Sequence, residues 1–252
     1  MHDDQANGLR RLFGAPTPCL LSVAGPGVTP VTLDLAAALA RLGRRVLLLD
    51  RSRGEAARAC GLAVRYELAH VLSGDKAWRD VVLPGPDGIA IMPAARALDA
   101  LDCDGRDWQA SIAALAPAAG QKFDVWLLNG PPAVRGAHAE VLLPITPTAA
   151  AITGAYAQIK RLALDHGRRD FRVLVHRAQS ETAALEAYRS FAATAQRYLS
   201  ARLDFCGTIP NEGPTSRAVR RGVADARSPR GHAFLRLAES IAAAASPQPA
   251  AL

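Results

Sequence analysis

The chain has 252 residues, half of them apolar, so it can bury one large hydrophobic core, and we expect a single main domain. Its formal charge of +7 comes from basic residues that are spread along the whole chain, which argues against direct nucleic acid binding. The four cysteines form no CxxC pair and the histidines lack metal-ligand spacing, so no metal site is expected. No apolar run approaches the roughly 18 residues that cross a bilayer, and the polar, acidic start is unlike a signal peptide. These features predict a cytoplasmic protein.

In chain order, residues 3–13 are compatible with a short amphipathic helix, which a Gly- and Pro-rich stretch then ends. Residues 1–18 are therefore expected to form an N-terminal arm and linker. Short apolar runs of the kind found in buried parallel strands follow at Cys19–Val23, Val46–Leu49, Ile89–Met92, Asp124–Leu128, Val141–Ile145, Arg172–Val175 and Leu203–Cys206. The clearest helical patterns between and after them cover residues 30–42, 107–116, 151–166, 182–201, 214–224 and 230–245.

This alternation predicts βαβ units. The expected fold class is α/β, a three-layer domain over residues 19–245 with a mainly parallel sheet of about seven strands. The Pro- and Ala-rich tail, residues 246–252, is expected to be disordered. The first long helix has clear boundary signals, since Thr29 can cap it, Pro30 suits its first position and Gly43 follows its end.

The loop after the first strand, Ser22–Thr29, contains Gly25, Gly27 and Thr29 before a helix. A strand, a glycine-containing loop and a helix N-terminus form the arrangement that binds phosphates in P-loop proteins. The motif GxxxxGK[ST] requires a lysine where this chain has Val28, and Pro26 has no N–H to donate. On these residues alone, a glycine turn that joins a strand to a helix is the better interpretation of the loop.

Several longer stretches indicate a family. They are Asp34–Ala40 with Leu42–Asp50, Val71–Gly74 with Val81–Gly88, Ile91–Ala94, Ala155–Lys160, and Gly207–Pro210 with Arg217–Val219. Together they resemble the FlhG/FleN family of flagellar-number regulators, which belongs to the MinD/ParA ATPases. The resemblance spans nearly the whole chain.

The N-terminus is similar to the DQAxxLR motif at the start of FlhG proteins, with Asp4, Gln5, Ala6, Leu9 and Arg10 at the motif positions. In the family this segment is understood to stimulate FlhF, an SRP-type GTPase. The resemblance therefore implies an FlhF-type partner, with a flagellar transcription activator as a second expected partner. The alternative for this segment is a frayed, solvated helix.

The family's ATP site implies a degenerate site here. The signature lysine that reaches across an ATP-bound dimer corresponds to Val23, and the P-loop lysine to Val28. Asp50 ends its strand, but the family's water-positioning carboxylate two residues later corresponds to Ser52. The Walker B aspartate corresponds to Asn129, whose uncharged amide is a poor magnesium ligand. The family's adenine-binding asparagine falls at His176.

Phosphoryl transfer depends on charge stabilisation by lysine and magnesium, so these substitutions together predict a pseudo-ATPase with vestigial positions at Gly25, Gly27 and Thr29. No cofactor and no ATP-dependent dimer are expected. The leading hypothesis is a FlhG/FleN-like regulator that acts through partners, which could recruit it to a cell pole or the inner membrane face. Two alternatives stay open: an ATP-switched ATPase with a deviant loop, and a scaffold in another polar or envelope system such as cellulose secretion.

Other features favour packing over function. The last helical segment is mostly alanine and lacks a strongly basic face, so we expect it to pack on the domain, with weak or absent membrane binding. Asp99, Asp102 and Asp104 are expected to form a solvated acidic loop. The three tryptophans show no stacking pattern and are assigned to packing; they are Trp78, Trp108 and Trp126.

Overall fold

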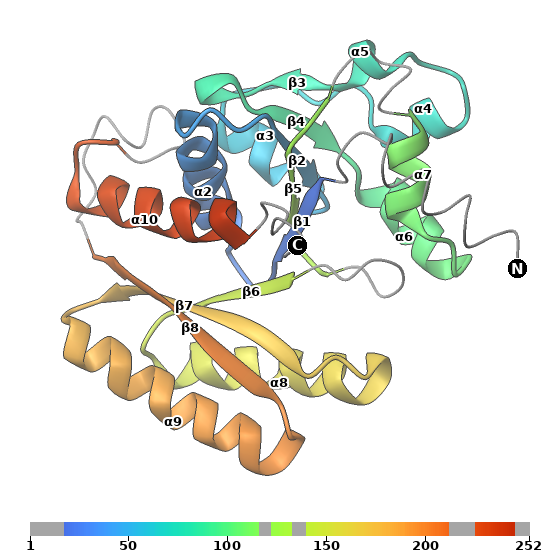
Figure 1. The fold of residues 1–252 in the computed structure, drawn as a ribbon. Helices are drawn as coiled ribbons and strands as arrows, with labels where there is room; N and C mark the ends of the chain where they lie inside the picture. Colours follow the sequence, from blue (N-terminus) through green and yellow to red (C-terminus); the bar gives the residue numbers. More distant parts are fainter. Residues whose placement is uncertain (1–17, 116–121, 133–139, 212–224, 245–252) are drawn as a thin grey trace, which may run out of the picture.

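The structure is a computed structural model that describes residues 18–115, 122–132, 140–211 and 225–244 (Figure 1). It confirms the predicted three-layer α/β fold. Within the described residues, eight strands form one sheet in the order β3-β4-β2-β5-β1-β6-β7-β8. Neighbouring strands are parallel, except that β3 and β4 are antiparallel. The strands are β1 (Cys19–Val23), β2 (Val46–Asp50), β3 (Leu83–Pro84), β4 (Ala90–Pro93), β5 (Val125–Asn129), β6 (Glu140–Ile145), β7 (Asp170–Ala178) and β8 (Arg202–Pro210).

All seven predicted strands are present, and the eighth, β3, is a two-residue edge strand that is too short to leave a hydropathy pattern. The last two strands extend well beyond their apolar runs. Strand β7 includes the polar residues Asp170 and His176, and β8 continues to Pro210 through a change of register near Gly207. Pairing with a neighbouring strand extends these segments where hydropathy does not.

Helices connect the strands. The helical segments are α2 (Thr29–Arg41), α3 (Glu55–Ala59), α4 (Leu68–Leu72), α5 (Trp78–Val81), the 3-10 turn η1 (Pro86–Gly88), α6 (Ala95–Cys103), α7 (Trp108–Leu115), α8 (Ala149–His166), α9 (Glu181–Leu199) and α10 (Pro229–Ala244). Five of these match the predicted helical patterns to within about two residues. The segments α3 to α6 were not predicted individually, because most of them are too short to show a helical period.

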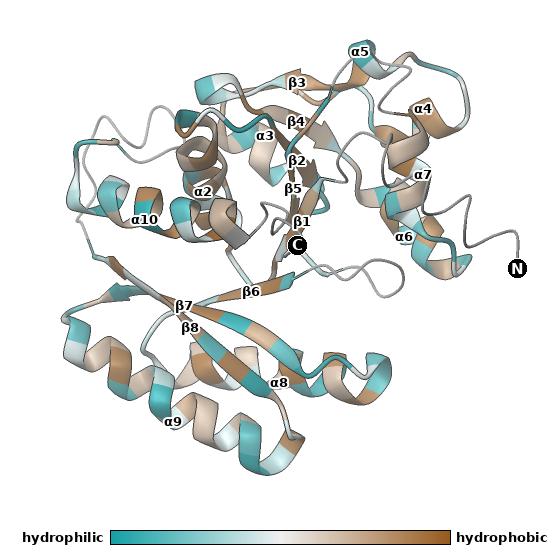
Figure 2. Ribbon diagram, viewed as in Figure 1, coloured by the Kyte–Doolittle hydropathy of each residue, from teal (hydrophilic) through white to brown (hydrophobic). Residues whose placement is uncertain are grey.

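Helices cover both faces of the sheet (Figure 1). On one face, α2, α3 and α10 pack against apolar side chains from β1, β2 and β5. On the other face, α8 and α9 cover β6, β7 and β8, and α4 to α7 cover the end of the sheet that contains β2 and β4. The central strands β1, β2 and β5 are apolar and buried along their length, as expected for a sheet covered on both faces, whereas β7 and β8 also carry hydrophilic residues (Figure 2). The assignment of the tryptophans to packing is confirmed, since all three are buried in the core between the sheet and α4–α7: Trp126 from β5, Trp78 from α5 and Trp108 from α7.

The last helix packs on the domain, as predicted. Ala233, Phe234, Leu237, Ala238 and Ile241 are buried in the same core cluster as α2. At its start, the Arg230 guanidinium donates to the Asp34 carboxylate on α2, with an Nε to Oδ2 distance of 2.9 Å. The apolar face of α10 is therefore already covered by the domain.

Several predicted segments lie outside the described residues: the arm helix over 3–13, the helix over 214–224 and the tail over 246–252. Among the helices that the structure describes, none is long and apolar enough to span a membrane.

Candidate functional site

The carboxyl ends of β2, β5 and β1 bring three of the predicted site segments together. Strand β5 lies between β1 and β2, and Asn129 at its end is in register with Val23 on one side and Asp50 on the other. The glycine loop follows β1, and the segment that contains Ser52 follows β2. Ligands of open α/β sheets bind at this edge. The sequence had placed these residues in one site, and the topology puts them next to each other.

Asn129 is completely buried and connects these segments through its side-chain amide. Its Nδ2 donates to the Thr29 hydroxyl at 3.2 Å and to the Ser52 hydroxyl at 3.0 Å. The same nitrogen lies 3.2 Å from the Asp50 carboxylate oxygen Oδ1. On the other side, the Thr32 hydroxyl donates to Asn129 Oδ1 at 2.9 Å. We call Asn129 and these four partners the amide cluster.

Asp50 is fully buried, and its carboxylate holds the segment that follows β2. Its oxygens accept the backbone N–H groups of Ser52 at 3.0 Å and Ala56 at 3.1 Å, and Oδ1 also accepts the Ser52 hydroxyl. Hydrogen bonds from several donors can stabilise a buried carboxylate in place of a neighbouring cation. The loop after β2 is thereby fixed to the end of the strand.

The Thr29 hydroxyl is hydrogen-bonded to two other side chains of the protein. Its hydroxyl donates to the Glu55 carboxylate of α3 at 3.0 Å while accepting from Asn129. In a working P-loop the corresponding hydroxyl binds magnesium. Glu55 and Thr32 were missed as site residues from the sequence. The spacing of Thr32, three residues after Thr29 on one helix face, was a possible signal, whereas Glu55 approaches only through the packing of α3 on α2.

The glycine loop itself is lined by apolar side chains. Val23 and Val28 belong to the main hydrophobic core, with 0% and 4% of their surface exposed. Gly25 and Gly27 have φ angles of +143° and +64°, which favour glycine, and Pro26 between them is exposed. A Cβ atom at Gly25 would lie 3.2 Å from Val28 Cγ1, so the valine packs closely against the loop.

Three local predictions need correction. Thr29 does not cap α2: it is the first residue of the helix, Val28 is at the N-cap position without a side-chain hydrogen bond, and the Thr29 hydroxyl contacts Glu55 instead. Pro30 is therefore the second helical residue and not the first as predicted, although it still lies in the first turn, while Gly43 follows the end of the helix as predicted, with a φ angle of +78°. The expected solvated acidic loop is also wrong for Asp99 and Asp102. These residues lie on α6 and pair with Arg51 at 2.7 Å each, because the helix turns them toward the segment after β2.

His176, the position of the family's adenine-binding asparagine, lies on β7. Burial lowers its pKa to about 4, and the positive charges of Arg230 and Arg177 contribute to the same shift. The imidazole is therefore neutral at physiological pH. The proposed partner-activating residues Asp4, Gln5, Ala6, Leu9 and Arg10 lie outside the described residues.

Comparisons with known proteins identify the fold and the family of the chain. No protein-family model matches the chain. MinD of Aquifex aeolicus superimposes with a TM-score of 0.64 at 21% identity, over 92% of this chain and 99% of that chain. McdA of Cyanthece gives a TM-score of 0.61 at 15% identity, over 88% and 99% of the two chains. The fold is therefore that of the MinD/ParA-type P-loop NTPases.

A closer sequence relationship defines the particular family. The chain is 34% identical to the antiactivator FleN of Pseudomonas aeruginosa over 231 residues, which cover 86% of this chain and 82% of that protein. The chain belongs to the FleN family of MinD/ParA-type proteins, as the resemblance in its sequence predicted.

Proposed function

We propose that this chain is a FleN-type regulator of flagellar number or placement that acts by binding partners and does not hydrolyse ATP. Its relative is named an antiactivator, and we extend that role to this chain with a flagellar transcription activator as one partner. We place the protein in the cytoplasm, where partners recruit it to a pole or to the inner membrane face.

The amide cluster is the observation that carries this proposal. Phosphoryl transfer needs cations and magnesium around the terminal phosphate, and magnesium prefers oxygen ligands at close to octahedral geometry. Here an amide nitrogen of Asn129 points at Asp50, Ser52 and Thr29. The Thr29 hydroxyl is further engaged by Glu55. These residues satisfy one another without a metal ion, so they do not fit ATP with magnesium.

The buried valines support the same conclusion. The positions of the two family lysines are held by Val23 and Val28 inside the hydrophobic core. No ammonium group can therefore reach a phosphate from either position. Loss of one such group commonly lowers the rate of phosphoryl transfer by orders of magnitude.

Calorimetric titration with ATP and magnesium tests the proposal directly, together with a phosphate-release assay in which an active MinD protein serves as the positive control. We expect no micromolar binding isotherm and no turnover above the protein-free rate. A clear micromolar isotherm or magnesium-dependent turnover would show that the chain is an ATP-switched ATPase with a deviant loop.

The N-terminal motif supports a second activity, stimulation of an FlhF-type GTPase. We propose that Gln5 orients the attacking water in the partner's nucleotide site, as a Ras-type glutamine does, and this step needs no ATP chemistry in the protein that supplies the glutamine. Ala6, Leu9 and Phe13 would dock the segment through a small apolar face, and Arg10 through a charge-assisted contact.

This second activity is tested with the full chain and its cognate FlhF. Gln5→Ala should abolish the stimulation of GTP hydrolysis and leave binding largely intact, whereas a Leu9→Ala/Arg10→Ala double variant should weaken binding itself. If the wild-type chain binds FlhF but leaves its turnover unchanged, the segment is only a tether.

A further inference from the structure

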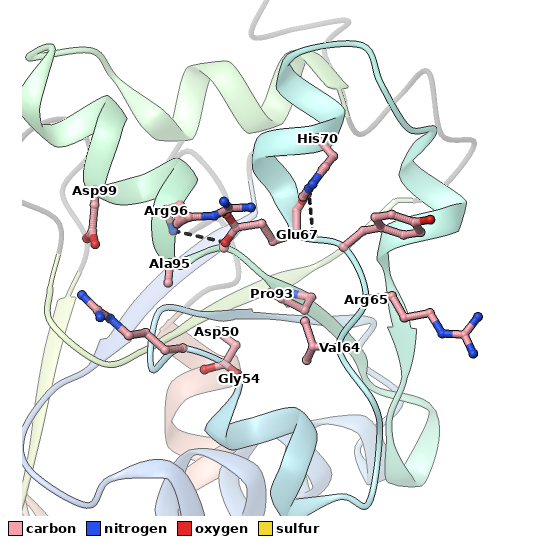
Figure 3. A pocket seen from close by; sticks show the side chains of 13 residues that line it. Asp50, Gly54, Val64, Arg65, Glu67, His70, Pro93, Ala95, Arg96 and Asp99 are labelled. Carbon is pink, nitrogen blue, oxygen red and sulfur yellow. Dashed lines mark hydrogen bonds and ion pairs between the residues drawn. The ribbon is translucent and has the colours of Figure 1, made fainter.

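A cavity of about 560 Å³ opens next to the amide cluster, at the carboxyl ends of β2 and β4 (Figure 3). Asp50 contributes to its wall, so the cavity and the amide cluster share a residue. The remaining wall comes from the loop after β2, from the segment Val64–Glu67 that leads into α4, from His70 on α4, from Pro93 at the end of β4 and from the start of α6. We call this hollow the β2/β4 cavity. Its chemistry is set by arginines, carboxylates and a few exposed apolar side chains.

The carboxylates of the β2/β4 cavity are already used within the protein. Asp50 is buried and accepts backbone N–H groups. Glu67 accepts the backbone N–H of Arg96 at 3.2 Å and pairs with the Arg96 guanidinium, so it also covers the N-terminus of α6. Asp99 accepts two hydrogen bonds from Arg51, at 2.7 and 2.9 Å. These acidic groups are therefore not available to neutralise other cations.

Two arginines of the cavity have guanidinium groups whose charge is not neutralised by a carboxylate of the described residues. Arg53 and Arg65 are both exposed, and within the described residues neither guanidinium has a carboxylate partner. Arg65 points outward from the rim in Figure 3, where it can reach a ligand that extends beyond the cavity. Arg96, although paired with Glu67, keeps 72% of its side chain exposed. The unpaired charge around the opening is positive, which favours an anionic ligand.

Apolar surface accompanies this charge. Val64 and Tyr66, on the segment before α4, are 41% and 36% exposed. The Lys76 ammonium lies 4.6 Å from the centroid of the Tyr66 ring and adds a further positive charge beside it. Uncompensated guanidinium groups next to exposed valine and tyrosine side chains suit a peptide that has both carboxylates and an apolar anchor, whereas a bare inorganic anion would leave the apolar part unused.

The cavity wall is also held in place without nucleotide. Arg53 and Gly54 have consecutive left-handed φ angles of +57° and +85°, and Asp50 fixes the residues on both sides of them through Ser52 and Ala56. A Cβ atom at Gly54 would lie 3.4 Å from Val64 Cγ2, so the two walls approach each other closely at this glycine. A preorganised wall lowers the entropic cost of binding.

We propose that the β2/β4 cavity is a docking site for an acidic segment of a protein partner. Carboxylates of that segment contact Arg53 and Arg65, and an apolar side chain packs against Val64 and Tyr66. The inference rests on the proposed function, in that it names where a partner-binding regulator holds its partner. A second copy of the chain is the less suitable occupant, because each copy has a formal charge of +7.

The test is a fluorescence-anisotropy titration of the full chain with a labelled peptide in which glutamates flank a leucine and a phenylalanine. The matched probes replace the glutamates by glutamines, or the two apolar residues by serines. The double variant Arg53→Glu/Arg65→Glu should bind the acidic peptide at least about tenfold more weakly, because attraction becomes repulsion at two contacts. Arg161→Glu/Arg189→Glu, which changes exposed arginines on α8 and α9, has the same net charge and should bind like the wild type.

Each outcome decides the matter. Preference for the acidic peptide over both matched probes, lost only in the Arg53/Arg65 variant, supports the docking site. Failure to bind the acidic peptide, equal loss in both double variants, or complete displacement by millimolar phosphate overturns it. Titrations with and without ATP and magnesium separate the two proposals, since nucleotide binding with unchanged peptide binding contradicts only the pseudo-ATPase assignment. Binding to anionic vesicles but not to the peptide, lost in the same variant, would identify a membrane surface instead.

Discussion

At the scale of single residues, the Asn129 side chain determines how the buried polar groups at the carboxyl ends of the strands are hydrogen-bonded. Its amide nitrogen is a donor between the Asp50 carboxylate and two hydroxyl groups, and its oxygen accepts from Thr32. An aspartate in the same place would have no hydrogen to donate and would put a second carboxylate next to Asp50. The amide therefore donates to the Asp50 carboxylate directly, whereas an aspartate at this position would need a cation between the two carboxylates.

Asn129→Asp should lower the free energy of unfolding by about 2–4 kcal/mol, because it removes buried donors and introduces like-charge repulsion. Millimolar magnesium should restore part of this loss, since the introduced carboxylate would join Asp50 and the Thr29 hydroxyl as oxygen ligands. Thermal melts with and without magnesium measure the effect. Asn129→Leu is the matched control: it loses the same hydrogen bonds and should gain nothing from magnesium. Equal magnesium responses in the two variants would contradict the prediction.

His176 predicts a pH dependence of stability. Its pKa is about 4 in the folded chain and near 6.5 when unfolded, so between these values the unfolded chain binds more protons. The contribution of His176 to the free energy of unfolding is therefore fully present above about pH 6.5. As the pH falls toward 4, this contribution decreases by roughly 1–3 kcal/mol. Urea unfolding across this range should show the wild type losing more stability than His176→Gln. Parallel pH profiles of the two proteins would rule out the shift.

At the scale of elements, α10 closes one face of the domain. Phe234 is 1% exposed and Arg230 anchors the first turn of α10 to Asp34 on α2. Phe234→Ala should lower the free energy of unfolding by about 3–5 kcal/mol, as expected for loss of a buried phenyl ring. Arg236→Ala, on the exposed side of the same helix, should change it by less than about 0.5 kcal/mol. Chemical denaturation compares the two variants, and similar losses would mean that α10 does not pack as described.

The same packing predicts weak membrane binding. An interfacial helix needs a free apolar face, and the apolar face of α10 is buried against the domain. Co-sedimentation with anionic liposomes should therefore leave most of the protein in the supernatant. Strong binding that disappears when residues 230–252 are deleted, with the truncated chain still folded by circular dichroism, would show that the helix can leave the domain.

At the scale of the whole molecule, the structure bears on nucleotide-dependent assembly. The resemblance to the family puts Val23 at the position of a lysine that reaches across the dimer to the partner's ATP, and the Val23 side chain has no exposed surface. Sedimentation velocity should therefore give the same sedimentation coefficient with and without ATP and magnesium. A dimer that forms only in the presence of ATP would contradict both this prediction and the proposed function.

Local sequence patterns are sufficient to predict the layered fold. Buried parallel strands leave apolar runs, and long amphipathic helices leave a period near 3.6, so both can be recognised locally. The resemblance to the FlhG/FleN family predicted Val28, Ser52 and Asn129 as departures from an ATP site, and Ser52 and Asn129 meet in the amide cluster. The short helices α3 to α6 and the edge strand β3 left too few residues for a period to be recognised.

The partners of the side chains at these positions follow from the tertiary packing. Thr29 meets Glu55 across 26 residues, Thr32 meets Asn129 across 97 and Asp34 meets Arg230 across 196. Such contacts depend on which helix packs on which strand, and residue periodicity has no information about partners at that distance. The same holds for the β2/β4 cavity, whose arginines come from separate segments. The sequence predicts which charges are missing from the family's ATP site, while tertiary packing determines which side chains contact one another at those positions.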